Sequence, residues 1–274
     1  MRPLVDRQVV SVAVNLPGPL AARRLADLGA HVLKVEPPAG DPLATYAPGL
    51  YAELSAGMEI VVRDLKQSPL GVLLVEADVL ITSSRPSSLA RLGLDPAALA
   101  AHPRLCHVGI VGSAGDDAEA AGHDLNYQAA AGLVRPPQLP VSLLADMAGG
   151  ERAAFAALAL LAERERTGRG GTAQVALAEA AAVLAAPLRA GLTAAGAVLG
   201  GGSPTYGVYA SADGHVAVGC LEPQFALRLA DELGTATAEG LAAAFRRRSS
   251  ADWATWAGAR DLPINAVTSP PPPG

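Results

Sequence analysis

The sequence has 274 residues, of which 50% are hydrophobic, 17% are charged and 4% are aromatic. A chain of this length can bury a large core, and its apolar volume comes mainly from Ala, Leu and Val, which argues against disorder over most of its length. The net charge of −5 does not suit a nucleic-acid surface, which needs clustered positive charge. We therefore expect no nucleic-acid partner.

Several signals of membrane, redox and metal proteins are missing from the sequence. We expect no signal peptide and no membrane span, because the Ala-rich stretch 175–199 is interrupted by charged residues and a proline. Cys106 and Cys220 lie in apolar runs without a CxxC partner, so we expect buried free thiols. The histidines show no metal-ligand spacing. These features predict a cytoplasmic protein without a metal site.

The first elements form a strand–helix–strand unit. A Val-rich strand at 8–15 is followed by a helical pattern at 20–28 and a second strand at 31–36. The right-handed crossover rule makes such a pair of strands parallel. The turn after the first strand is LPGP and lacks the GxGxxG fingerprint, which weakens a nicotinamide-binding interpretation.

The alternation of strands and helices continues through the middle of the chain. It predicts an α/β fold built on an open, mostly parallel, Rossmann-like sheet with helices on both faces. A long Ala-rich helix is expected after the last strand. The further predicted strands are 60–63, 78–82, 104–111 and 173–177, and the further helices are 68–76, 87–92, 95–101 and 153–166.

A change of pattern near residue 200 indicates a smaller second domain. The linker GGGSPTYG leads to a hairpin at 208–221 with an Asp-Gly turn, and two or three helices follow. We therefore predict a large α/β domain at 1–199, a small α+β domain at 200–268 and a disordered proline-rich tail at 269–274.

Two residues in the middle of the chain suggest acid–base chemistry. His123 and Asp146 each stand at the head of a small-residue segment that is typical of a helix start. A proton donor and a proton acceptor in such positions suit chemistry at a carbon next to a carbonyl. Both residues also have structural interpretations: His123 as a capping or core histidine, and Asp146 as the N-cap of a helix beginning at Met147.

The sequence resembles the family III CoA-transferases, and more closely their α-methylacyl-CoA racemase branch. Matching stretches occur in the family's order over nearly the whole chain. They are GPLAARRLADLGAHVLKVEPPAGDP, DLKQSPLG, EADVLI-x₃-RP, LARLGLDPAAL, GHDLNY, LLADMAGG, LLAERERTGRG and YASADGHVAVGCLEPQF. The GHD and EPQF motifs point to the racemase branch, since the transferases usually carry a tyrosine in place of His123.

The resemblance implies an interlocked homodimer with an active site between one subunit's large domain and the other's small one. It implies that His123 and Asp146 face the α-carbon of an acyl thioester from opposite sides, with Glu222 nearby. Backbone N–H groups around Asp146 and 148–150 would hold the enolate oxygen. The implied coenzyme A-binding residues are Arg85, Arg91, Gly122, Asp124, Leu125, Asn126, Tyr127 and Gly149; Asp124 also suits a structural cap.

The sequence departs from the family where basic residues would meet the coenzyme A phosphates. Residues 55–60 carry no cation, Pro37 replaces an arginine, and the loop GSAGDDAEAAGHD is acidic. We therefore expect a divergent, shortened member with no tightly bound cofactor. The expected substrate is a coenzyme A thioester, a carrier-protein phosphopantetheine thioester or a related compound without a thioester, and an acyl-carrier protein is a candidate partner.

Three classes of function stay open at this point. The leading one is an isomerase working through an α-carbanion, in which enolisation could also serve epimerisation, elimination or ring closure. The second is a CoA-transferase that uses Asp146 as a nucleophile to form an acyl-aspartyl anhydride. The third is a non-catalytic binding protein.

Overall fold

The computed structural model describes residues 1–268. By their contacts, these residues form two compact units, the first being Met1–Ala185 and the second beginning at Ala186. The sequence predicts a boundary somewhat later, between residues 199 and 200. The predicted disordered tail at 269–274 lies outside the described residues.

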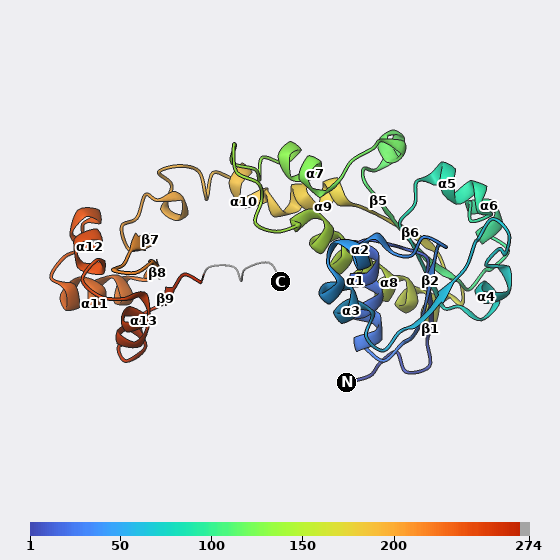
Figure 1. The fold of residues 1–274 in the computed structure, drawn as a ribbon, viewed down its shortest axis with the longest axis horizontal. Coiled ribbons are helices and arrows are strands. Elements are labelled where there is room, and N and C mark those ends of the chain that lie inside the picture. The colour runs from blue at the N-terminus through green and yellow to red at the C-terminus, as the bar shows by residue number, and fades with distance from the viewer. Residues whose placement is uncertain (269–274) are drawn as a thin grey trace. The chain divides into compact units, whose positions relative to one another are not determined.

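The first unit, drawn in blue to yellow in Figure 1, is built on a six-stranded sheet. The strand order is β3-β2-β1-β4-β5-β6, and every neighbouring pair is parallel. This confirms the predicted Rossmann-like sheet, since the order reverses direction between β1 and β4 as in doubly wound folds. The strands are β1 (Gln8–Ser11), β2 (His31–Glu36), β3 (Glu59–Val62), β4 (Val79–Thr82), β5 (Cys106–Val111) and β6 (Thr172–Ala176).

Helices cover both faces of the sheet. Successive residues of a strand point to opposite sides, so apolar strands present residues to be buried on both faces. In β1, Val9 packs into the core beneath α1 and α8, whereas Val10 packs with leucines of the opposite face. The helices of this unit are α1 (Pro17–Asp27), α2 (Pro42–Tyr46), α3 (Pro48–Ser55), α4 (Gly71–Glu76), α5 (Pro86–Arg91), α6 (Pro96–Leu99), α7 (Asp124–Ala130), α8 (Leu144–Thr167) and α9 (Leu177–Leu184), with a 3₁₀ turn η1 (Gly115–Glu119).

Helix α8 begins nine residues before the predicted start at residue 153 and buries a different face. The sequence pattern places Phe155, Leu158, Leu161 and Ala162 on one side of this helix; Leu161 is buried, but Phe155 is 74% exposed. The inward face consists of small residues, including Gly149, Gly150, Ala153 and Ala157. A Cβ on Gly150 would lie 2.8 Å from the carbonyl oxygen of Pro17, so the glycine allows α8 to approach α1 closely. The predicted side is wrong for Phe155 because the prediction followed the large apolar residues.

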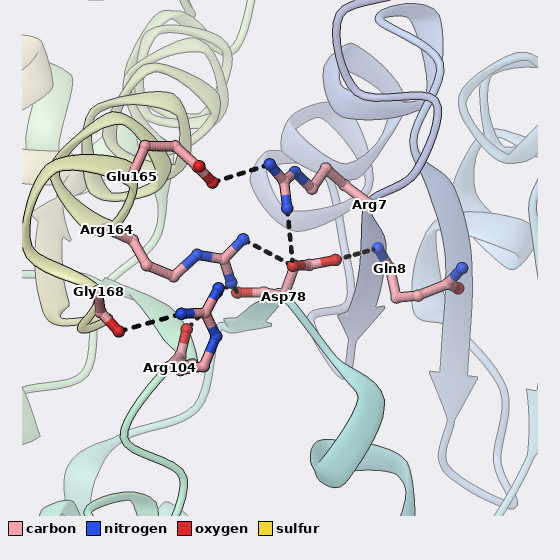
Figure 2. Close-up of polar contacts among 7 residues, drawn as sticks. All are labelled: Arg7, Gln8, Asp78, Arg104, Arg164, Glu165 and Gly168. Carbon is pink, nitrogen blue, oxygen red and sulfur yellow. Dashed lines mark hydrogen bonds and ion pairs between the residues drawn. The ribbon is translucent and has the colours of Figure 1, made fainter.

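A polar network ties β1, β4, β5 and α8 together at the amino ends of the strands (Figure 2). The Asp78 carboxylate accepts from Arg164 at 2.6 Å and from the backbone N–H of Gln8 at 2.7 Å. Arg164 is buried and also donates to the carbonyl oxygen of Arg104 at 3.0 Å. A buried guanidinium requires such a partner set, so this edge of the sheet has a structural role.

The Ala-rich segment after β6 is not the single long helix that the sequence predicts. Helix α9 ends at Leu184, α10 covers only Ala186–Arg189, and turns lead to η2 (Val198–Gly200). Pro187 and the glycines at 191 and 196, both with positive φ, interrupt the helical pattern. Helices α2 and α3 and strand β9 are additional elements that the sequence did not predict.

The second unit is a three-stranded antiparallel sheet, in the order β7-β8-β9, with three helices packed on it. It includes the predicted hairpin. Its core contains Phe245 and Trp253, whose ring centroids lie 5.0 Å apart. Cys220 in this core and Cys106 in the first unit are both buried free thiols, as expected. The elements are β7 (Tyr206–Ala210), β8 (His215–Gly219), α11 (Pro223–Leu233), α12 (Ala238–Phe245), α13 (Ser250–Gly258) and β9 (Ile264–Ala266).

Candidate active site

A cavity of about 710 Å³ lies in the first unit at the carboxyl ends of the central strands. Its walls include Asn15 after β1, Arg85 after β4 and Gly112 after β5. The strand order reverses between β1 and β4, which is where ligands bind in open α/β sheets. His123 and Asp146 both line this cavity.

His123 occupies the N-cap position of α7, with the extended backbone that such a position requires (φ −131°, ψ 169°). Its backbone N–H donates to the side-chain oxygen of Asn126 at 3.0 Å, and its carbonyl oxygen accepts from the N–H of Asn126 at 2.8 Å. This pair of bonds fixes the backbone that carries the imidazole at the cavity wall. Asn126 does not itself line the cavity, so its contribution is to hold the backbone of His123.

Asp146 lies in the first turn of α8 and is half-buried. The helix begins two residues earlier, at Leu144, and no side chain caps it at Leu143, so the suggestion that Asp146 caps a helix starting at Met147 is wrong. Burial is the main cause that raises the pKa of Asp146 to about 6; the charge of Asp124 raises it further and the charge of His123 lowers it. A carboxyl with this pKa can give or take a proton near neutral pH.

Asp124 connects the two segments that carry the acid–base pair. Its buried carboxylate accepts from the backbone N–H of Asp146 at 3.0 Å and from the side-chain amide of Gln128. The first contact holds the start of α8 against α7, which supports the structural role considered for this residue. Asp124 also lines the cavity.

The predicted binding residues divide into two groups. Those that line the cavity are Arg85, Gly122, Asp124, Leu125 and Tyr127, whereas Arg91, Asn126 and Gly149 do not. Gly149 is buried, and a Cβ there would lie 2.2 Å from the Cδ2 of Leu177, so this glycine allows α8 to pack against α9.

Arg85 and Arg91 lie near an acidic neighbour from the loop before α7. The Glu119 carboxylate accepts from the backbone N–H of Ser87 at 2.7 Å and from its hydroxyl at 2.9 Å. These bonds from Ser87 are the largest causes that lower the pKa of Glu119, and the charges of Arg85 and Arg91 lower it further. A fixed carboxylate therefore partly neutralises the two arginines that were expected to meet phosphate.

A buried ionic cluster supports another wall of the cavity, and it was not predicted from the sequence. Lys34 is fully buried and pairs with Glu36 and with Asp41, the latter at 2.7 Å. Asp41 also accepts from the backbone N–H groups of Asn15 at 2.9 Å and Leu43 at 3.0 Å. Asn15 has a φ of 67°, an unusual conformation that this contact stabilises. The signal in the sequence was a lysine inside an apolar strand.

The remaining predicted catalytic residue, Glu222, lies in the second unit at the N-cap position of α11, and its side chain makes no capping hydrogen bond. Its charge contributes, after burial, to raising the pKa of Cys220 to about 11. Within residues 1–268, no group of three His, Cys, Asp or Glu side chains is arranged to hold a metal ion. None of the helices described is both long and apolar enough to cross a membrane.

The fold and the position of the cavity define a doubly wound α/β protein with its candidate site at the switch point. The family model described as CoA-transferase family III matches residues 4–270, and the chain belongs to this family. It is 27% identical to the hypothetical protein Rv3272 of Mycobacterium tuberculosis, whose crystal structure it matches with a TM-score of 0.84 over 98% of this chain and 85% of that one. A CAIB/BAIF family protein of Brucella suis matches with a TM-score of 0.83 at 25% identity, over 97% of this chain and 84% of that one.

Racemases and transferases both occur among the relatives. The human alpha-methylacyl-CoA racemase is 34% identical over 82% of this chain and 63% of its own length, and the mouse enzyme is 33% identical over 90% and 68%. The mouse succinyl-CoA:glutarate CoA-transferase is 32% identical over 62% of this chain and 44% of its own length. The chain thus spans about two thirds or less of the length of these relatives.

Proposed function

We propose that this protein exchanges the α-proton of an acyl thioester, as in the racemisation of a 2-methylacyl group. The observation that carries the proposal is that His123 and Asp146 line one cavity at the switch point of the sheet. One group removes the proton, the neighbouring oxygen takes enolate character, and the other group returns a proton on the opposite face. The similarity to racemases supports this choice.

The raised pKa of Asp146 suits a group that alternates between acid and base. In the direction in which Asp146 removes the proton, it must be ionised. Its pKa is about 6, so the exchange rate should rise as the pH increases through that value. The rate should level off once the carboxyl is fully ionised.

The proposal is tested by α-proton exchange in deuterated water. The substrates are 2-methylbutanoyl-CoA and 2-methylbutanoyl-pantetheine, and the variants are His123→Ala and Asp146→Asn. We expect deuterium uptake by the wild type and a loss of about 100-fold or more in each variant. Asp117→Asn, an exposed change on the loop before α7, is the matched control and should keep the wild-type rate.

A CoA-transferase is the alternative, because transferases are also among the relatives. In that reaction the Asp146 carboxylate would attack the thioester carbonyl and form an anhydride, with release of the thiol. Mass spectrometry separates the two reactions. An acyl adduct on Asp146 without deuterium uptake would replace the proposal by transfer, whereas deuterium uptake without an adduct supports it.

We further propose that recognition of the coenzyme A phosphates is weakened, so that a carrier-protein phosphopantetheine thioester is an accepted substrate. Among the described residues that line the cavity, Arg85 carries the single permanent positive charge, and Glu119 partly offsets it. Calorimetry should then show similar affinities for the CoA and pantetheine thioesters. An affinity for the CoA thioester that is at least 100-fold tighter would remove this part of the proposal.

Glu222 is assigned in this proposal as a third catalytic group, supplied in a homodimer, because of its match to the racemase motif. Glu222→Gln should lower the exchange rate while leaving the unfolding temperature unchanged. An unchanged rate in this variant would remove Glu222 from the proposed site and would leave the assignment of His123 and Asp146 in place.

A further inference from the structure

A carbanion next to a thioester forms at a useful rate only if the carbonyl oxygen is stabilised by a hydrogen-bond donor. Two of the backbone N–H groups near Asp146 that are candidates for this role already have acceptors within the chain. The N–H of Asp146 donates to Asp124 at 3.0 Å, and that of Met147 donates to the carbonyl oxygen of Leu143 at 3.0 Å. The following N–H groups lie within α8, where they pair along the helix. The N–H groups of Asp146 and Met147 are thus paired within the chain, which directs attention to side-chain donors at the cavity wall.

The Tyr127 side chain offers such a donor at the cavity wall. The residue is 8% exposed and lines the same cavity as His123 and Asp146. Its hydroxyl lies against two glycines: a Cβ would be 2.2 Å from it at Gly112 and 2.7 Å from it at Gly122. Both glycines line the cavity as well. Larger residues at either position would displace the hydroxyl, so the two glycines define where it sits.

This hydroxyl has no hydrogen-bond partner within residues 1–268, and it is not one of their fully buried unpaired polar atoms, so it is open to the cavity. It lies close enough to Asp146 for that charge to raise its pKa, in addition to the larger effect of burial; Arg85 acts in the opposite direction. Tyr127 therefore keeps its proton near neutral pH and can donate it in a hydrogen bond.

We propose that the Tyr127 hydroxyl donates the hydrogen bond that stabilises the thioester oxygen while the α-proton is transferred, which makes Tyr127 a catalytic residue. The inference rests on the proposed function. As the C–H bond breaks, its electron pair forms the enolate double bond and the carbonyl π pair moves to the oxygen. The α-proton goes to His123 or Asp146, and the phenol keeps its own proton. Return of a proton to the carbon reverses these shifts.

The test uses Tyr127→Phe, which removes only the hydroxyl, and Asp117→Asn, an exposed change on the loop before α7 that does not line the cavity, as the control. With 2-methylbutanoyl-pantetheine in deuterated water, Tyr127→Phe should lower the exchange kcat by about 100-fold, with a smaller effect on KM. The control should stay within about twofold of the wild type. Exchange by Tyr127→Phe at the wild-type rate would overturn the inference.

A second measurement separates a hydrogen bond to the oxygen from a structural role. The affinity of each protein is measured by calorimetry for the same thioester and for S-(2-methylbutyl)-pantetheine, a thioether that lacks the carbonyl oxygen. Tyr127→Phe should bind the thioester about 10-fold more weakly and the thioether as tightly as the wild type does. Equal weakening of both ligands would mean that the phenol only supports the fold, and would overturn the inference.

The two measurements also separate this inference from the proposed function. If the wild type shows no α-proton exchange, the proposed function fails. A selective loss of thioester affinity in Tyr127→Phe would then still establish Tyr127 as the donor to the carbonyl oxygen. If the wild type exchanges the proton and Tyr127→Phe matches it in both rate and affinity, the proposed function stands and the assignment of Tyr127 is wrong.

Discussion

Asp146 is held in surroundings that favour its protonated form. The half-buried carboxyl has lost part of its hydration and faces the charge of Asp124, while His123 only partly compensates. Its pKa in the folded protein is about 6, compared with an ordinary value of 3.8. A pKa that is raised by folding means that the folded state binds the proton more tightly than the unfolded state does. The residue that suits acid–base chemistry therefore has a cost in stability at neutral pH.

This cost gives a prediction for Asp146→Asn. The protonated carboxyl stabilises the fold fully below pH 4, and this contribution is lost as the pH rises through about 6. Asparagine does not ionise. The free energy of unfolding of the variant, relative to that of the wild type, should therefore rise by about 2 kcal/mol between pH 4 and pH 7.5. Urea unfolding at the two pH values measures the gain. Asp117→Asn should show no comparable change, and a constant difference between Asp146→Asn and the wild type would contradict the prediction.

The positions of the candidate residues illustrate what the sequence can indicate about a site. The motifs GHDLNY and LLADMAGG led to His123 and Asp146, and the structure brings both to one cavity. The partners of these residues were harder to predict. That Asp124 accepts from the N–H of Asp146 depends on how α7 and α8 meet. Contacts between segments that are distant in the sequence leave no local pattern.

At the level of elements, continuous apolar runs predicted the strands well because each central strand is buried on both faces. All four residues of β4 are buried, for example, and the predicted strand 78–82 differs from it by one residue. Helix α8 was predicted poorly. Its buried stripe is mostly glycine and alanine, which carry little hydrophobic signal, so the periodicity of the larger residues predicted the buried Leu161 but also the exposed Phe155.

The close packing of α1 and α8 can be tested with a pair of glycines. In Gly150→Ala the new methyl group would approach the carbonyl oxygen of Pro17 and the Cδ2 of Leu20 at 2.8 Å each, so we expect a loss of about 1–3 kcal/mol in the free energy of unfolding. Gly49 lies in α3 with nothing within 4 Å of the added atom. Gly49→Ala should therefore be neutral or stabilising by up to about 1 kcal/mol. Urea unfolding monitored by circular dichroism compares the two, and equal effects would contradict the packing argument.

At the scale of the whole molecule, the two compact units have separate hydrophobic cores. The core of the first consists of sheet residues with α1, α8 and their neighbours, and that of the second centres on Phe245 and Trp253. Both tryptophans of the chain, Trp253 and Trp256, lie in α13 of the second unit. Tryptophan fluorescence therefore reports on the second unit alone, whereas far-ultraviolet circular dichroism reports on both.

This separation predicts that the units unfold in distinguishable steps. Phe245 is fully buried and contacts Tyr209 and Trp253, with ring centroids 5.3 Å and 5.0 Å away, so Phe245→Ala should destabilise the second unit by about 3–5 kcal/mol. The fluorescence transition should then move to lower urea, while most of the circular dichroism change stays at its wild-type midpoint. In Gly150→Ala the other probe should respond: the circular dichroism transition should move to lower urea, and the fluorescence transition should stay at its wild-type midpoint. If the transitions of the two probes move together in both variants, the cores unfold as one cooperative unit. A destabilising change in α8 would then also destabilise the unit that carries Glu222.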